Sequence, residues 1–389
     1  MIENPHAASM PAMPDAAVTE SAHREQTPQP TVPEQQAMER ALELARTGAF
    51  SRRGGNPRVG CVLLDASGAV IGSGHHRGAG TPHAEVAALT AAGPAARGGT
   101  AVVTLEPCNH HGRTGPCSAA LISAGVTRVI FAQPDPNPLA TGGADRLRSA
   151  GVTVIGGFRS AEAIKINSDW TFAREHGRPF VRLKLASTLD GRVAARDGSS
   201  QWITSLPARQ DGHRLRADSD AVLTGTGTVL ADNPRLTARP NAEPDADIEQ
   251  PIRAVFGTTA LPADAAIFDD AADTVLLRTR SPEQALAELI RLGACSVLIE
   301  GGPGAAAAFL ESGLVDEVIN YVAPVILGSG PAAIGDLGID SVTDAVRGVI
   351  TDVRSIGTGD ELCVRITTRL ECSGPADADR THLDQETEE

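Results

Sequence analysis

Three residues in the first third of the chain are of the types that bind zinc. His83 lies in the run TPHAEVAAL, and Cys108 and Cys117 lie in the run TLEPCNHHGRTGPC. Zinc in proteins is usually tetrahedral, with Cys sulfur and His nitrogen as common ligands. Three protein ligands leave one position open for water, which is typical of a catalytic rather than a structural zinc. We therefore predict a catalytic metal site at these three residues.

Glu85, two residues after the histidine, supplies what such a site needs for hydrolysis. Two thiolates and one imidazole leave zinc acidic enough to ionise water near neutral pH. A neighbouring carboxylate can then carry the proton to a leaving amine. Zinc deaminases of nucleobases combine such ligands with a glutamate that does not bind the metal. The pattern predicts a hydrolytic deaminase in which Glu85 carries the proton.

Each of these residues has an ordinary alternative role when it is taken alone. His83 could cap a helix or lie in a core, and the two cysteines could be buried apolar residues. The cysteines are also eight residues apart, whereas the usual deaminase motif is C-x-x-C. The joint pattern of His-Ala-Glu, the strand-like run TAVVTL and Glu-Pro-Cys favours the metal site.

Prolines mark where the elements that hold these ligands begin. Pro82 precedes His83 and Pro116 precedes Cys117, which predicts a helix start at each ligand. The positive end of a helix dipole favours a thiolate. A strand is expected over residues 100–104, between the two helices.

The remaining elements of the first half predict an α/β/α sandwich. A helix is expected from Pro33 to about Thr47, followed by a hairpin over 59–64 and 69–72. The apolar face of that helix consists of Met38, Ala41, Leu42 and Ala45. After the metal segment, a short helix at 144–150 lies between the strand-like runs TRVIFA and GVTVIGG. Such alternation of helix and strand is typical of layered α/β domains.

Asn56 lies just before the first expected strand. Its amide offers both a donor and an acceptor, as the edge of a pyrimidine requires. It could equally be a turn asparagine before Pro57, and the surrounding sequence does not decide between the two roles.

Composition limits the class of protein. The 389 residues carry a formal net charge of −14, and 41% of them are hydrophobic. This length allows two or three domains. We find no basic patch of the kind that binds nucleic acid, no apolar run long enough for a membrane span and no signal peptide. The six cysteines form no disulfide framework, so a reducing, cytoplasmic location is expected. Residues 1–32 and 372–389 are predicted to be disordered.

A second α/β domain is expected from about residue 180. The strand-like runs VRLKLA and DAVLTG flank a helical run, SLPARQDGHRLRA, and a polar loop follows over 240–250. Further strands are expected at IRAVF, TVLLR, SVLIE, DEVINYVAPVIL and ELCVRITTRL, with a helix over 282–292.

A glycine loop in this half could hold a dinucleotide. Gly301, Gly302 and Gly304 follow a strand and open a helix, so backbone N–H groups could approach a pyrophosphate. The loop lacks the full G-x-G-x-x-G pattern and could be a plain helix start. A second glycine-rich strand end, TGTGTV at 224–229, favours the dinucleotide.

Over roughly residues 35–370 the chain resembles bifunctional riboflavin-biosynthesis enzymes, which fuse a pyrimidine deaminase to a ribosyl reductase. The first half carries NPRVGCVL, HAEVAAL, TLEPCNHHGRTGPC and PDPNP. The second carries LKLASTLDGR, SQWIT, RADSDAVLTGTGTVLADNPRLTAR and EGGPG. The chain departs from many members at Gly115, where they have proline.

The resemblance implies roles for residues in the first domain. His83, Cys108 and Cys117 would bind zinc, and Glu85 would be the proton shuttle. Three further residues would hold the substrate, an amino-pyrimidinone that carries ribose phosphate: Asn56, His110 and Arg113. Taken alone, His110 could instead be a spare metal ligand or a solvated loop residue.

For the second domain the resemblance implies a dihydrofolate-reductase-like α/β fold and NADPH as cofactor. The residues that would contact NADPH are Ala186, Trp202, Thr228, Asp232, Gly302, Pro303, Gly304, Ala305, Ala306, Ala307 and Ala308. Those that would contact the substrate are Ser200, Arg216, Leu236, Arg239 and Glu300. The reaction would reduce the opened ribose to a ribityl chain.

Several of these residues have simpler alternatives. Arg216 and Arg239 suit a phosphate because guanidinium pairs with it in a bidentate manner, but surface ion pairs are commoner. Asp232 could be a turn residue, and Trp202 could belong to the core. Lys184 alternates with apolar neighbours, so it faces either away from them or into the site.

We therefore expect a cytoplasmic homo-oligomer that acts on a phosphoribosylated aminopyrimidine, with zinc and NADPH as cofactors. Its deaminase domain would span 33–176 and its reductase domain 177–371. One alternative is a zinc deaminase of another nucleobase or nucleotide with a degenerate second domain. Another is a non-catalytic binding protein stabilised by zinc. The motifs of the second half disfavour the first alternative, and Glu85 beside an open zinc position disfavours the second.

Overall fold

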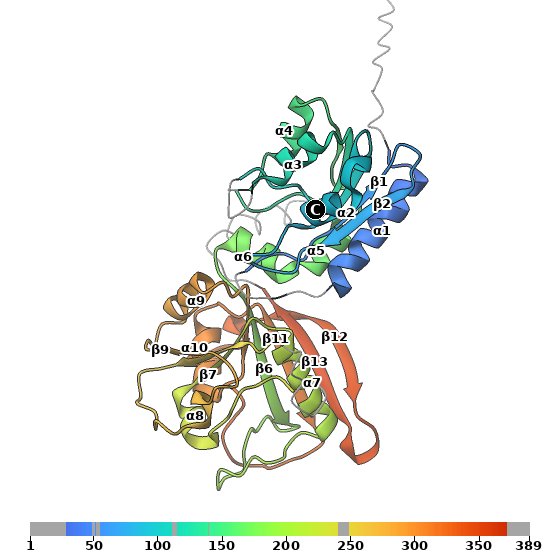
Figure 1. The fold of residues 1–389 in the computed structure, drawn as a ribbon. Helices are drawn as coiled ribbons and strands as arrows, with labels where there is room; N and C mark the ends of the chain where they lie inside the picture. The colour runs from blue at the N-terminus through green and yellow to red at the C-terminus, as the bar shows by residue number, and fades with distance from the viewer. Residues whose placement is uncertain are drawn as a thin grey trace, which may run out of the picture.

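The structure is a computed structural model that describes residues 29–48, 51, 55–110, 115–138, 140–239 and 249–371. Within these ranges the chain forms two bodies, one above the other in Figure 1, each built around its own sheet. The N-terminal extension up to residue 28, loop residues 240–248 and the tail 372–389 lie outside the described residues.

The first body is an α/β/α sandwich, as the sequence predicts. Its sheet has the order β2-β1-β3-β4-β5, in which β1 is antiparallel to both neighbours and β3, β4 and β5 are parallel. The strands are β1 (Gly60–Leu64), β2 (Val70–His75), β3 (Thr100–Leu105), β4 (Arg128–Gln133) and β5 (Thr153–Ile155). The helices are α1 (Val32–Thr47), α2 (Ala84–Ala92), α3 (Cys117–Ala124), α4 (Gly143–Ser149), α5 (Ser160–Ile166) and α6 (Ser168–His176).

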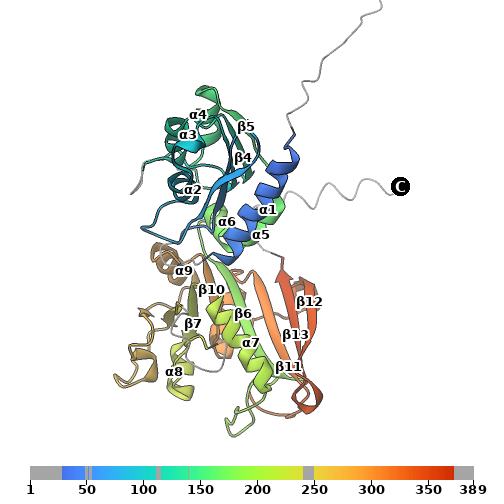
Figure 2. The same ribbon diagram turned by 45° about the vertical axis from the view of Figure 1, so that its right-hand side comes forward.

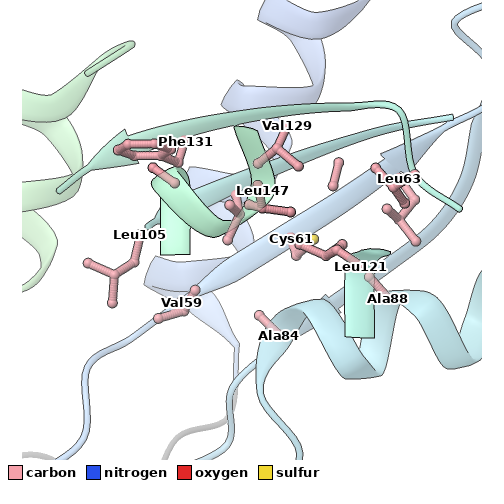
Figure 3. Close-up of a cluster of buried hydrophobic side chains, with 14 of the residues drawn as sticks. Val59, Cys61, Leu63, Ala84, Ala88, Leu105, Leu121, Val129, Phe131 and Leu147 are labelled. Atoms are coloured by element: carbon pink, nitrogen blue, oxygen red, sulfur yellow. The ribbon is translucent and has the colours of Figure 1, made fainter. Parts of the chain in front are cut away.

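Alternate side chains of these strands fill a core on each face of the sheet. Cys61, Leu63 and Phe131 belong to the cluster that packs against α2, α3 and α4 (Figure 3). Their neighbours Val62 and Ile130 pack with α1 and α5 on the other face. Successive strand residues point to opposite faces, so a sheet covered on both sides needs continuous apolar runs. The metal-ligand segment thus starts from a sheet that is covered on both faces.

Helix α1 begins with a capping box that lies inside the predicted extension 1–32. Thr31 N donates to Glu34 Oε2 at 2.7 Å, and Arg128 Nε donates to Glu34 Oε1 at 2.6 Å. Because a capping box satisfies backbone groups at a helix start, Thr31 belongs to the folded part of the chain. The helix begins at Val32, one residue before the predicted start.

The second body is a larger mixed sheet with the order β12-β13-β11-β6-β10-β7-β8-β9. Strands β11 to β9 are parallel, and β13 and β12 add two antiparallel strands at one edge. The strands are β6 (Phe180–Thr188), β7 (Ala221–Gly225), β8 (Ile252–Phe256), β9 (Thr274–Leu277), β10 (Ser296–Ile299), β11 (Glu317–Ala323), β12 (Gly348–Ile356) and β13 (Cys363–Leu370). The helices are α7 (Leu206–Ala217), α8 (Thr226–Asp232), α9 (Pro282–Arg291) and α10 (Pro303–Glu311).

Two features of this body differ from the sequence expectation. The run TGTGTV is the end of β7 followed by α8, so its glycines begin a helix rather than only end a strand. Strand β12 was not expected at all. Most of its residues are exposed, and so it lacks the in-and-out alternation of a half-buried strand.

Helix α6 lies where the two bodies meet (Figures 1 and 2). Arg182 of β6 pairs with Asp169 of α6 through two hydrogen bonds of 2.7 and 2.8 Å. Cys295, just before β10, belongs to the same buried cluster as Trp170 and Ala173 of α6. The second body therefore contributes to the core of the first. Among the described residues, none of the helices has the length and apolarity to cross a bilayer.

Candidate active sites

The structure brings the three predicted metal ligands together. Cys108 Sγ lies 3.6 Å and Cys117 Sγ 3.3 Å from His83 Nδ1, and the three donor atoms all lie within 4.8 Å of one another. Zinc–sulfur and zinc–nitrogen bonds of about 2.3 and 2.0 Å at a tetrahedral angle would separate ligand atoms by about 3.6 Å. The donor set and its spacing therefore fit zinc.

Helix starts hold these ligands, as the two prolines predict. His83 is the N-cap residue of α2, and Cys117 is the first residue of α3. The backbone N–H of Cys117 points at Cys108 Sγ at 3.4 Å. A backbone donor at a helix N-terminus stabilises a thiolate. The eight-residue spacing between the cysteines is thus compatible with one metal site.

Glu85 lies in the first turn of α2 and is only 4% exposed. Burial raises the pKa of its carboxyl to about 7, since no nearby cation of the protein fully offsets the lost hydration. Its carboxyl lines the same cavity as His83 and Cys108. A carboxyl that can both hold and release a proton therefore faces the metal ligands.

The cavity at this site has a volume of about 190 Å³. Five of the predicted residues line it: Asn56, His83, Glu85, Cys108 and His110. Cys117 is fully buried and does not line the cavity. Arg113 lies outside the described residues. The size is suited to a single small ring rather than to a polymer.

Hydrogen bonds of His76 determine which way the amide of Asn56 faces. His76 Nδ1 lies 3.1 Å from the carbonyl oxygen of Pro82, so this nitrogen carries the proton and donates. The other ring nitrogen, Nε2, then accepts from Asn56 Nδ2 at 3.0 Å. Burial lowers the pKa of His76 and so favours this neutral form. The amide oxygen of Asn56 is left as the acceptor for a ring N–H.

His76, Glu106 and Asp135 line the cavity but were not predicted as site residues. Burial raises the pKa of Asp135 to about 6, and Glu106 accepts hydrogen bonds from the backbone N–H groups of Asp135 and Ala144. The only sequence signals for them were the polar runs GHH, LEP and PDPNP, which carry no metal-ligand spacing. Their roles depend on contacts between segments far apart in sequence.

A second and larger cavity, of about 750 Å³, lies in the second body at the carboxyl ends of β6, β7 and β10. This is where open α/β sheets usually bind ligands. It brings together eleven of the predicted residues: Ala186, Ser200, Arg216, Thr228, Asp232, Leu236, Glu300, Gly302, Pro303, Gly304 and Ala305. Lys184 also lines this cavity, so of the two orientations that the sequence allows, its side chain has the one that faces the site.

Glu300 is the anionic centre of this cavity. Arg216 Nε and Nη2 donate to its two oxygens, at 2.5 and 3.0 Å, and Lys184 Nζ lies 3.5 Å away. Burial opposes ionisation, but the charges of Arg216 and Lys184 outweigh it and lower the pKa of Glu300 to about 2. Glu300 is therefore a fixed anion. The guanidinium of Arg216 pairs with this carboxylate, so it is not free to pair with a phosphate in the structure.

The glycine loop after β10 has the form that a nucleotide site needs. Gly302 is the N-cap of α10, and its backbone N–H donates to Thr228 Oγ1 at 2.9 Å. A Cβ at Gly301 would lie 2.9 Å from the Cβ of Ala305, so only glycine fits there. A Cβ at Gly304 would meet nothing within 4 Å and would project into open space. This glycine cradle at a helix N-terminus fits a dinucleotide phosphate.

Five predicted residues of the second body do not line this cavity: Trp202, Arg239, Ala306, Ala307 and Ala308. Trp202 is 68% exposed with Arg209 stacked 4.2 Å from its ring centroid, so it is not a core residue either. Ala306 and Ala307 are both buried, and Ala306 belongs to the apolar core of the second body. Arg239 precedes residues 240–248, and its buried Nε has no partner among the described residues.

Two family models match the chain. The cytidine and deoxycytidylate deaminase zinc-binding region matches residues 32–133, and the RibD C-terminal domain matches residues 179–360. The first contains all three candidate metal ligands, and the second contains the whole 750 Å³ cavity.

Curated relatives and solved structures agree with this division. The riboflavin biosynthesis protein RibD of Mycobacterium tuberculosis is 43% identical over 325 residues, covering 82% of this chain and 95% of the relative. RibD of Escherichia coli K12 is 40% identical over 362 residues, covering 85% and 98%. The structure of Acinetobacter baumannii RibD superposes with a TM-score of 0.77 at 38% identity and covers 87% of this chain and 99% of its own. That of a Thermotoga maritima deaminase/reductase gives 0.75 at 32%, with the same coverage.

Proposed function

The chain belongs to the RibD family of riboflavin biosynthesis, and on that premise we propose which residues perform its two reactions and where its domains divide. It is a bifunctional enzyme, a zinc-dependent deaminase and an NADPH-dependent reductase. Both halves match the family, so the alternative of a deaminase with a degenerate second domain is set aside. The substrate of the first reaction would be the diaminohydroxyphosphoribosylaminopyrimidine named for the Thermotoga maritima protein.

His83, Cys108 and Cys117 would hold the zinc of the deaminase. Zinc supplies the Lewis acidity that makes water a nucleophile near neutral pH. Glu85 would take a proton at its buried carboxylate and return it to the nitrogen that leaves as ammonia. Asn56 would accept a hydrogen bond from the pyrimidine ring, and His110 and Arg113 would hold the rest of the substrate. The observation that carries this proposal is that Glu85 and two of the ligands line the same cavity.

The reductase would use residues that line the larger cavity. NADPH supplies the hydride that reduces the opened ribose. Its phosphates would lie on the backbone of Gly302–Ala305, with Thr228, Asp232 and Ala186 beside it. Ser200, Arg216, Leu236 and Glu300 would contact the substrate, and Lys184 would supply a cation next to Glu300. Trp202, Arg239 and Ala306–Ala308 remain sequence predictions that the described cavity does not support.

The proposed domain boundary follows from the helix that joins the bodies. The deaminase domain would span 33–176, with the Thr31 cap added, because α6 ends at His176. The reductase domain would span 177–371, since its sheet runs from Phe180 to Leu370. Extensions 1–28 and 372–389 would flank the two domains. None of the five described cysteines is in a disulfide, which supports a reducing, cytoplasmic location.

Strand β12 supports the expectation of a homo-oligomer. It is an edge strand, and Ile350 and Val353 are 59% and 60% exposed. A register shift after Ile350 brings both onto one face, opposite Thr368 and Ile366. An exposed apolar edge strand is a template for a second chain. Val353→Arg should therefore dissociate the oligomer in sedimentation velocity, with Asp352→Asn as control, and an unchanged sedimentation coefficient would contradict this surface.

One coupled assay tests the proposed order of reactions. The full chain with zinc should oxidise NADPH when it is given the aminated pyrimidine, and it should release one ammonia for each NADPH. Removal of zinc by a chelator should stop both signals with this substrate. The deaminated pyrimidine should still support NADPH oxidation in the chelated protein. NADPH oxidation from the aminated substrate without ammonia release would contradict the order.

A further inference from the structure

The segment Gly55–Arg58 carries Asn56, and its first three residues line the cavity that holds the proposed zinc ligands, called the zinc cavity below. Helix α6 and the residue before it hold this segment at both ends. Asn167 Oδ1 accepts from the backbone N–H of Arg58 at 2.8 Å, and Asn167 Nδ2 donates to the carbonyl of Arg58 at 2.9 Å. Arg174 Nη2 donates to the carbonyl of Gly55 at 2.7 Å. The backbone on either side of Asn56 is thus fixed by α6.

Arg174 donates to the Gly55 carbonyl, and its side chain also lines the zinc cavity together with Trp170. Its guanidinium carbon lies 5.9 Å from the Trp170 ring centroid. Its Nε is buried, and the part of the chain that the structure describes offers it no hydrogen-bond partner. A buried donor without a partner is costly, so residues of this kind need a reason to be kept in place. A surface ion pair, the commoner role of an arginine, does not describe this environment.

A turn of the second domain packs against Gly55, next to Arg174. A Cβ on Gly55 would lie 2.9 Å from the carbonyl oxygen of Gly293 and 3.4 Å from Cys295 Sγ, both in the turn between α9 and β10. It would also lie 3.1 Å from Arg174 Nη2. Gly55 has a φ of +63°, a conformation that glycine adopts readily. Gly55 is therefore enclosed between Arg174 and a turn of the reductase domain.

We propose that Arg174 is a positioning residue for deamination, which holds Gly55 and through it the Asn56 amide in the zinc cavity. The Gly293–Cys295 turn takes part by closing the other side of Gly55. The reductase domain thereby contributes to substrate binding in the deaminase without supplying a group that touches the substrate. The inference rests on the proposed role of Asn56, which the experiment tests separately.

The experiment measures substrate binding apart from turnover. In a Glu85→Gln background, calorimetry on the full chain gives the Kd of the aminated pyrimidine with and without Arg174→Met. Loss of a hydrogen bond from a charged donor should weaken binding about tenfold. Arg174→Lys keeps one donor and should recover part of the affinity. Glu175→Gln, on the exposed side of the same helix, should leave the Kd unchanged.

Kinetics in the Glu85-containing enzyme supply the second readout. Arg174→Met should raise KM for deamination about tenfold, with little change in kcat, zinc content or the rate of reduction of the deaminated substrate. Cys295→Ala should raise KM less, and the double variant should fall short of the product of the single effects, because neighbouring residues that act on one wall are not additive. If Arg174→Met does not fold, Arg174→Lys and Cys295→Ala carry the test.

Two results distinguish a wrong role for Asn56 from a wrong role for Arg174. If Asn56→Ala leaves the Kd unchanged, the proposed role of Asn56 is wrong. If Asn56→Ala weakens binding but Arg174→Met binds and reacts like the unmodified enzyme, Asn56 keeps its role and the positioning role of Arg174 is overturned. A fall in melting temperature of Arg174→Met without any change in KM or Kd would likewise reduce Arg174 to a structural residue.

Discussion

Glu85 in the deaminase site and Glu300 in the reductase site are both largely shielded from solvent, and the two glutamates have opposite acidities. Glu85 lies among apolar groups and metal ligands, and burial raises the pKa of its carboxyl to about 7. The Glu300 side chain is 10% exposed and so nearly as buried, but Arg216 and Lys184 lower its pKa to about 2. The difference lies in the partners rather than in the depth of burial. The first glutamate is arranged to exchange a proton, and the second to remain an anion that orients cations and substrate.

The two cavities also differ in volume and in how widely their residues are spread along the chain. The deaminase site is small, about 190 Å³, and its metal ligands and proton carrier come from one stretch of 35 residues from His83 to Cys117. The reductase site is about 750 Å³ and draws on segments that follow five strands, β6, β7, β8, β10 and β11. A hydrolysis at one ring carbon needs few groups at fixed distances, whereas a dinucleotide and a sugar phosphate need a long surface.

The largest effect should come from removing the proton carrier. Glu85→Gln keeps the size of the side chain and does not alter a metal ligand, so zinc should stay bound. Deamination should fall about a hundredfold or more, as expected for loss of general acid–base catalysis. Ammonia release and metal analysis measure both quantities, and Glu43→Gln on exposed α1 is the control. Near-normal ammonia release with zinc bound would remove the assigned role of Glu85.

A smaller effect, on the other reaction only, should follow from Asp232→Asn. Asp232 lines the reductase cavity at the end of α8, where it can orient cofactor and substrate. Loss of this orientation should slow NADPH oxidation about tenfold or more, since misplacement of reactants is costly. Ammonia release from the aminated substrate should not change. A loss of ammonia release in this variant would show that the deaminase site depends on the reductase site.

The Glu300 carboxylate should make the second domain sensitive to acid. A carboxyl whose folded pKa is below its unfolded value stabilises the fold above the unfolded value, and that stability is lost as pH falls toward the folded pKa. For Glu300 the window lies between about 4.5 and 2, and the contribution is about 3 kcal/mol. Urea unfolding of Glu300→Gln should show lower stability at pH 7 and a smaller loss between these pH values. Equal acid sensitivity in both proteins would contradict the charge network.

The smallest effect concerns the start of the first domain. Deletion of residues 1–28 should leave the melting temperature and both activities nearly unchanged. Deletion of residues 1–31 also removes the Thr31 cap, which is worth about 1 kcal/mol, and should lower the melting temperature by about 2–4 °C. A thermal scan of the two truncations checks both. A loss of several degrees on deleting 1–28 alone would show that the extension docks.

The metal site could be predicted because its chemistry is local in sequence. Cysteine, histidine and glutamate types, two prolines and one strand were enough to place His83, Glu85, Cys108 and Cys117 together, and the structure confirms the helix starts. The resemblance supplied most of the reductase residues, since their roles depend on loops that only the folded sheet brings side by side. Of these, five do not line the cavity: Trp202, Arg239, Ala306, Ala307 and Ala308.

Other features depend on contacts that no local pattern contains. Arg174 and Asn167 contact a segment more than 100 positions earlier in the chain. His76 acquires its role only because Pro82 and Asn56 lie on either side of its ring. Strand β12 was not predicted because most of its residues are exposed, so its sequence lacks the alternation of apolar and polar residues. Residues of this kind read as ordinary polar or apolar positions until the tertiary structure is known.

The most direct test of two chemically separate sites is the reductase rate of Cys108→Ser. Loss of this thiolate should remove zinc and abolish ammonia release. The variant should still reduce the deaminated intermediate with NADPH at the rate of the unmodified enzyme, because the groups of the larger cavity all lie beyond Phe180. If NADPH oxidation from the deaminated substrate stops in a variant that circular dichroism shows to be folded, the two sites are coupled, and the division into independent reactions is wrong.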